Sequence, residues 1–123
     1  MPDIALALDP WPFNLTENPA MVQFVHRCLA MTLVAIVAVA WAMARRAPRR
    51  ARCAADILLG LVLLQAALGI ATLLTGADLV LAALHQVNAV LLLAAALWLG
   101  FNVARSARLT RPAAGTINPA VAI

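Results

Sequence analysis

Two histidines, His26 and His85, are the side chains in this sequence whose type and position best suit chemistry. Each lies several residues inside a long apolar run, and Gln23 and Arg27 flank the first of them. A neutral imidazole offers one nitrogen lone pair to a metal while its other nitrogen carries a proton. Polar groups inside membrane segments are costly, so they point to function. Metal ligation, hydrogen bonding between helices, and a proton or ion path are the three roles open to them.

The composition determines which elements must position these residues. Of the 123 residues, 65% are hydrophobic and 11% are charged, and the mean hydropathy is +0.95. Such a chain belongs among membrane proteins, where one helical span needs about 20 apolar residues. Three stretches qualify, at about 20–43, 55–75 and 79–103. Asn18-Pro19 is the expected start of the first helix, and Thr-Gly-Ala-Asp at 75–78 is a turn-like break between the last two. The predicted fold class is therefore an all-α membrane protein with three transmembrane helices.

The arginines predict how the chain is oriented. All nine basic residues are arginine. Eight lie in the first loop or the C-terminal tail, which three spans place on the same side of the membrane: Arg45, Arg46, Arg49, Arg50, Arg52, Arg105, Arg108 and Arg111. The positive-inside rule makes that side cytoplasmic. The expected layout is an outer-facing interfacial segment (1–18), a three-helix transmembrane region (19–104) and a cytoplasmic tail (105–123).

The predicted spans place both histidines at one depth. His26 and His85 each lie about seven residues into a helix that runs inward, so both imidazoles are roughly 10 Å below the outer helix ends. On the second helix, Gln65, Gly69, Thr72 and Gly76 are spaced to share one face. A glycine on that face allows close approach to the backbone.

Two level imidazoles on parallel helices would suit the axial positions of a planar heme. The second ring nitrogen then needs an acceptor, for which a helix carbonyl, Gln23 or Asn88 is available. Arg27 can reach the outer interface and meet a heme propionate. Spacing by itself leaves helix packing and an ion path open beside heme ligation.

Three strings of the sequence narrow the choice. NLTENPAMVQFVHRCLA, LLQAALGIATLL and LAALHQVNAVLLLAAALW follow one another along the chain. Together they resemble the C-terminal half of the heme A synthase family, membrane enzymes that oxidise heme O to heme A for cytochrome oxidase. The combination of VQFxHR, LQxxLGIxT and HQ in this order is specific, whereas each alone is not.

The resemblance implies roles for these residues. Family members have eight spans in two four-helix halves, and each half offers heme a histidine pair. His26 and His85 then correspond to the axial ligands of a heme b cofactor in the C-terminal half, with an electron-transfer role. The catalytic half has a glutamate three residues before its His-Arg, where this chain has Gln23. An amide cannot act as a carboxylate base, so no catalytic residue is expected here.

The chain would supply only the last three spans of such a protein. It therefore looks like a fragment, a split gene product or a chain that starts at an internal methionine, and by itself it is expected to be inactive. Its expected partners are membrane lipid, the remaining spans, and a heme O synthase or further copies, but not nucleic acid. The absence of lysine suggests a GC-rich bacterium, hence its inner membrane. The rival hypothesis is a non-enzymatic three-helix membrane protein that binds heme or partners.

Overall fold

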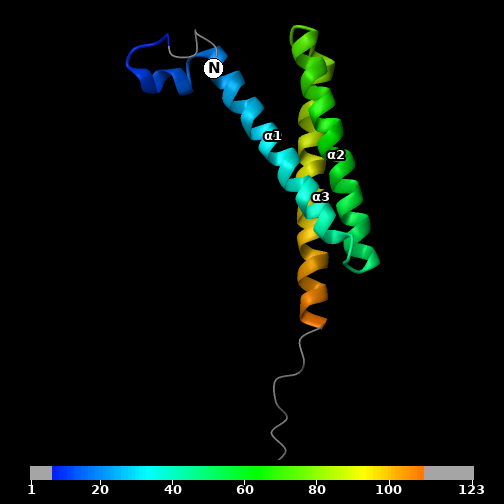
Figure 1. Cartoon of the computed structure of the whole chain (residues 1–123). Helices are drawn as coiled ribbons and strands as arrows, with labels where there is room; N and C mark the ends of the chain where they lie inside the picture. Colours follow the sequence, from blue (N-terminus) through cyan, green and yellow to red (C-terminus); the bar gives the residue numbers. More distant parts are fainter. Residues whose placement is uncertain (1–6, 110–123) are drawn as a thin grey trace, which may run out of the picture.

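The computed structural model describes residues 7–109, and every regular element in that range is helical. A short 3-10 helix, η2 (Trp11–Leu15), precedes three long helices, α1 (Pro19–Ala44), α2 (Arg49–Leu74) and α3 (Leu79–Leu109) (Figure 1). Each long helix is long and apolar enough to cross a membrane. The predicted fold class is thus confirmed, and the chain is a multi-pass membrane protein.

Asparagines determine how the first helix begins. The side chain of Asn18 accepts a hydrogen bond from the backbone N–H of Ala20, and Pro19 occupies the first helical position, as Asn-Pro predicts. The fully buried Asn14 accepts from the amide of Asn18 and from the backbone N–H of Leu8. These bonds fold η2 back onto the start of α1.

Two helices are longer than hydropathy predicts. α2 begins at Arg49 rather than near residue 55, and α3 continues to Leu109 rather than ending near 103. Arginine is a good helix former, so these helices extend past the apolar stretch into polar surroundings. The first residues of the predicted tail are therefore helical, while 110–123, with Arg111, lie outside the described residues.

The packed core extends from the middle of the bundle toward the loop between α1 and α2. It consists of Val37, Leu58, Val62, Leu92 and Ala95. α2 packs against both other helices, whereas no Cα pair of α1 and α3 in the described range comes within 8 Å. Away from this core, α1 diverges from α2 and α3 (Figure 1). Most of each span is uncovered, since at most 17% of its apolar window is buried inside the chain.

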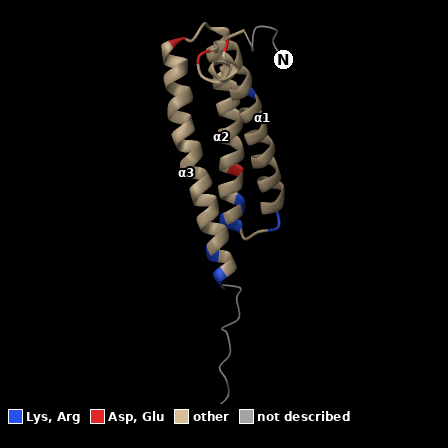
Figure 2. Cartoon of the chain, turned by 90° about the vertical axis from the view of Figure 1, so that its left-hand side faces the viewer, with Lys and Arg blue, Asp and Glu red and all other residues tan. Residues whose placement is uncertain are grey.

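Charge separates along the bundle. Arginines gather where α1 joins α2 and where α3 ends, and acidic side chains gather at the opposite end (Figure 2). We call these the basic end and the acidic end. Asp56 lies near the basic end, where its carboxylate accepts a hydrogen bond of 2.7 Å from the Trp41 indole. Arg27 is the ninth residue of α1 and so lies in the half of that helix nearer the acidic end.

The turn between α2 and α3 falls where the sequence predicts a break. Gly76 and Ala77 both have a positive φ, of 69° and 67°, a conformation that glycine adopts without strain. The side chain of Asp78 then accepts a hydrogen bond from the N–H of Leu81 and caps α3. Gly76 therefore belongs to the turn, and its predicted place on the polar face of α2 is wrong.

Candidate functional site

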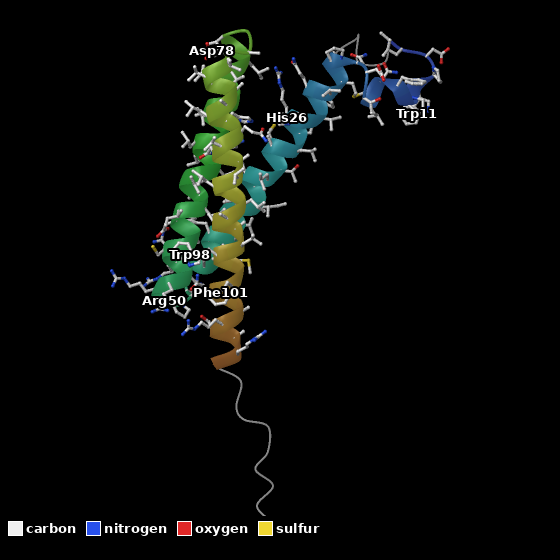
Figure 3. All side chains as sticks on the ribbon, turned by 180° about the vertical axis from the view of Figure 1, so that it is seen from behind. Trp11, His26, Arg50, Asp78, Trp98 and Phe101 are labelled. Atoms are coloured by element: carbon white, nitrogen blue, oxygen red, sulfur yellow. The ribbon has the colours of Figure 1, made fainter. Side chains whose placement is uncertain are left out.

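The two imidazoles meet in the half of the bundle nearer the acidic end. The ring centroids of His26 and His85 are 6.4 Å apart, with the ring planes at 67°. His26 lies on the side of α1 that faces the other helices, between the levels of Asp78 and Arg50 (Figure 3). Since the backbones of α1 and α3 stay apart, the side chains alone bring the rings together. Equal depth predicts this meeting.

Gly69 on α2 makes room for the ring of His85. A Cβ atom built at this glycine would lie 3.1 Å from Cε1 of His85 and 3.5 Å from Nδ1. The first distance is tighter than an ordinary van der Waals contact, so any larger residue would displace the imidazole. The sequence predicted a close approach to the backbone at this position, and the approaching group is His85 itself.

The side-chain amides of Gln65 and Asn88 extend from the His85 ring as a chain of hydrogen bonds. The Gln65 Nε2 atom lies 3.2 Å from Nε2 of His85. Asn88 donates from Nδ2 to Oε1 of Gln65 at 2.7 Å and to the backbone carbonyl of Leu61 at 3.0 Å. We call Leu61 O, Asn88, Gln65 and His85 the amide relay. It joins α2 to α3 beside the histidine pair.

The relay also determines which nitrogen of His85 carries the proton. A carbonyl only accepts, so the atom of Asn88 that faces Leu61 O must be its NH₂ group. That NH₂ group also faces Gln65, which must therefore present its oxygen to Asn88 and its own NH₂ group to His85. The Nε2 atom of His85 is then unprotonated and accepts the Gln65 N–H through its lone pair, and Nδ1 carries the hydrogen.

Two buried side-chain polar atoms at this site have no hydrogen-bond partner among residues 7–109. They are Nδ1 of His85 and Oδ1 of Asn88. Asn88 is only 4% exposed, so water does not readily reach its side chain to form the missing hydrogen bond. A buried polar atom without a partner in a native structure often marks a place where a ligand or a second conformation is accommodated.

Gln23 and Arg27 line a hollow on α1 that neither imidazole lines. Both are exposed, and Ala20 and Phe24 complete this hollow of about 130 Å³. Within residues 7–109, no hydrogen bond joins either of them to an imidazole. The ring of His85 contacts Gln65 directly and Asn88 only through Gln65. A helix carbonyl, Gln23 or Asn88 as acceptor for the second ring nitrogen stays a prediction.

Sequence reasoning placed Gln65 on the correct face but gave it no role. The feature of the sequence that could have indicated a role for Gln65 is its spacing from Gly69: the two lie one helical turn apart on α2, opposite His85. Thr72 continues that face in sequence, yet its hydroxyl donates to Leu68 O within its own helix. The two cysteines, Cys28 and Cys53, are free and exposed.

The donor set suits an axial pair better than a protein-only metal cage. Across residues 7–109, no three histidine, cysteine, aspartate or glutamate side chains form a potential metal-binding group. Structural zinc sites take four protein ligands, whereas heme iron already has four porphyrin nitrogens and takes its remaining ligands from the protein. Two imidazoles, one of them unprotonated at Nε2, fit that second requirement.

Known proteins resemble this chain over most of its length. Residues 1–97 match the cytochrome oxidase assembly protein family COX15-CtaA. A heme A synthase from Nitrosospira multiformis is 41% identical over 107 residues, which are 85% of this chain and 30% of that protein. The mouse heme A synthase COX15 is 46% identical over 80% of this chain and 24% of its own length.

A third relative, the heme A synthase of Rhizorhabdus wittichii, is 54% identical over 73% of this chain and 25% of its own length. The chain thus spans about a quarter to a third of the curated relatives it matches. No solved structure matches it.

Proposed function

Because this chain belongs to the COX15-CtaA family, which includes the heme A synthases, we propose that it is the C-terminal heme-binding segment of such an enzyme. His26 and His85 would hold the iron of a heme b. Such a heme would supply single-electron transfer in support of the oxidation of heme O to heme A.

One observation carries the proposal. Two imidazoles from α1 and α3 come together at 6.4 Å although the backbones of these helices stay apart. Direct packing of α1 against α3 does not explain this, because the two side chains bridge a gap across which the helix backbones make no contact. The relatives named above are heme A synthases, and the match covers both histidines.

The surrounding residues have separate tasks in this proposal. The amide relay holds His85 with its lone pair on Nε2, the atom that would bind a metal. Gly69 lets the ring lie against α2. Arg27 supplies a positive charge beside the open hollow, where a propionate is the expected partner. Gln23 lines the same hollow with a neutral amide.

The membrane arrangement follows from charge and from uncovered surface. The basic end is proposed to face the cytoplasm of a bacterium, across its inner membrane, with the segment before α1 outside. The spans bury little of their surface inside this chain. Further spans of the same enzyme, a fourth helix of this half above all, are proposed to cover the exposed side of the histidine pair.

The test is the absorption spectrum of the chain purified with the remaining spans of a relative. We expect the bands of a low-spin b-type heme, and we expect His26→Ala and His85→Ala to abolish them or lower heme content at least tenfold. Each variant removes one of two iron ligands, which no neighbouring side chain replaces.

Matched controls lie on the same helices. Cys28→Ala and Val87→Ala change exposed positions two residues from each histidine, and both should retain the wild-type spectrum. Unchanged spectra in both histidine variants would exclude the axial ligation. Loss of heme with retention of heme A formation would instead favour the rival, a heme-binding membrane module without a part in catalysis.

A further inference from the structure

The ligand nitrogen of His85 already has a partner. Nε2 accepts a hydrogen bond from the amide of Gln65, and the N–Cε1–N edge of the ring faces Gly69, with Nδ1 buried. A heme iron held by His85 would take Nε2, because binding through Nδ1 would require the ring to move away from α2. The Gln65 N–H would then have to leave Nε2.

The displaced N–H has one unused acceptor close by. Oδ1 of Asn88 is buried and unpartnered, and Nδ2 of the same amide already contacts Gln65 at 2.7 Å. A rotation of the Gln65 side chain would bring its N–H to Oδ1 while its oxygen keeps the Asn88 donor. Both amides would then form a paired, two-bond contact, and no buried donor would lose its partner.

We propose that Gln65 is a positioning residue that exchanges partners. With His85 free, it donates to Nε2 and holds the imidazole in the tautomer that binds iron. When iron takes Nε2, the same N–H turns to Asn88 Oδ1. This inference rests on the proposed heme ligation by His85, but its first half concerns the protein without heme.

The alternative explanation is that Gln65 only fills space between α2 and α3. A space-filling residue would not influence the tautomer of His85, and its effect on heme would not depend on Asn88. The two explanations therefore differ in one measurement without heme and in one with it.

The first measurement is ¹⁵N NMR of the histidine rings in the whole heme-free chain in lipid nanodiscs. The chain has only two histidines, so His26→Ala assigns the signals. We expect His85 to show a protonated Nδ1 and an unprotonated Nε2. Gln65→Glu replaces the donor with an acceptor and should reverse the two. A protonated Nε2 in the wild type would overturn the proposal.

The second measurement is titration with heme b, followed by absorbance, in the chain joined to the remaining spans. Gln65→Glu should weaken binding about tenfold, because Nε2 then carries a proton that iron must displace. Gln65→Leu should stay within about threefold, since leucine neither protonates Nε2 nor needs a second partner. Equal loss in both variants would show a packing role only.

Asn88 tests the exchange itself. Asn88→Leu should weaken heme binding about tenfold, because the Gln65 N–H then has no acceptor after iron binds. Adding Gln65→Leu to it should restore the affinity of Gln65→Leu alone. Additive losses in the double variant would refute the exchange.

Controls separate these effects from damage to the fold. Asn102 is also a buried asparagine on α3, bonded to Trp98 O in its own helix, so Asn102→Leu should leave heme affinity unchanged. Exposed Gln86 provides the matched glutamine variant, Gln86→Leu. If His85→Ala leaves heme binding intact, the proposed function fails, while the NMR measurement still decides the tautomer.

Discussion

The half of the bundle at the basic end and the half at the acidic end are built differently. At the basic end, a short loop joins α1 to α2, an apolar core connects all three helices, and the Trp41 indole donates to Asp56. Arg45 also lies over the Trp41 ring, 4.9 Å from its centroid. At the acidic end, α1 diverges, and two imidazoles and two amides replace the apolar contacts.

The difference indicates a division of tasks within one small bundle. Helices in lipid gain little from burying apolar side chains, so close packing and polar contacts decide their arrangement. The closed half fixes the crossing of α1 with α2. The open half can then hold polar groups that are costly inside a membrane, because contacts in the closed half already fix how the helices are arranged.

The largest expected effect concerns activity. This chain, expressed in cells that make heme O but no other heme A synthase, should produce no heme A above the empty-vector level. Its only two histidines are both used by the one proposed heme site, so no second pair remains for the substrate. Heme extraction and chromatography provide the measurement. Any heme A above background would show that the open half is a complete catalytic site.

The second prediction concerns the orientation of the two ends. A reporter that is active only outside the membrane should be active when inserted in the 75–78 turn and silent when fused after Ile123. Arginines at the basic end are retained on the cytoplasmic side. The reverse pattern would place the heme site near the cytoplasm and contradict the proposed topology.

The third prediction separates the site from the rest of α2. Gly69→Ala should lower heme affinity roughly fivefold, since its Cβ would lie 3.1 Å from Cε1 of His85 and displace the ring by a few tenths of an ångström. Gly60 lies on the same helix with nothing within 4 Å of its Cβ position. Gly60→Ala should therefore leave heme titration unchanged. Equal behaviour of both variants would mean that His85 does not bind heme in this position.

The smallest expected effect lies at the basic end. Trp41→Phe removes the indole donor to Asp56 and should lower the free energy of unfolding by about 0.5–1.5 kcal/mol, without altering the heme spectrum. Reversible denaturation in mixed micelles measures the change, and the exposed Met43 provides a control, Met43→Leu. A spectral change in Trp41→Phe would show that the two halves are coupled.

Much of the fold could be predicted because membrane physics acts on local composition. Apolar length determined the three spans, Asn-Pro fixed the start of α1, and the 75–78 turn followed from Thr-Gly-Ala-Asp. The helix ends were less accurate, since Arg49 and Leu109 extend helices into polar surroundings that hydropathy does not register. Equal depth also predicted that His26 and His85 would meet.

What the sequence by itself determined is a set of one-dimensional quantities: helix length, depth in the membrane, charge at each end and family membership. The tertiary structure decided which polar groups touch. Depth places Gln23, Gln65 and Asn88 all near the imidazoles, but only the rotation of α2 against α3 assigns Gln65 to His85 and Asn88 to Gln65. A hydrogen bond requires about 3 Å and a defined direction, and neither quantity is recorded in the spacing along a single helix.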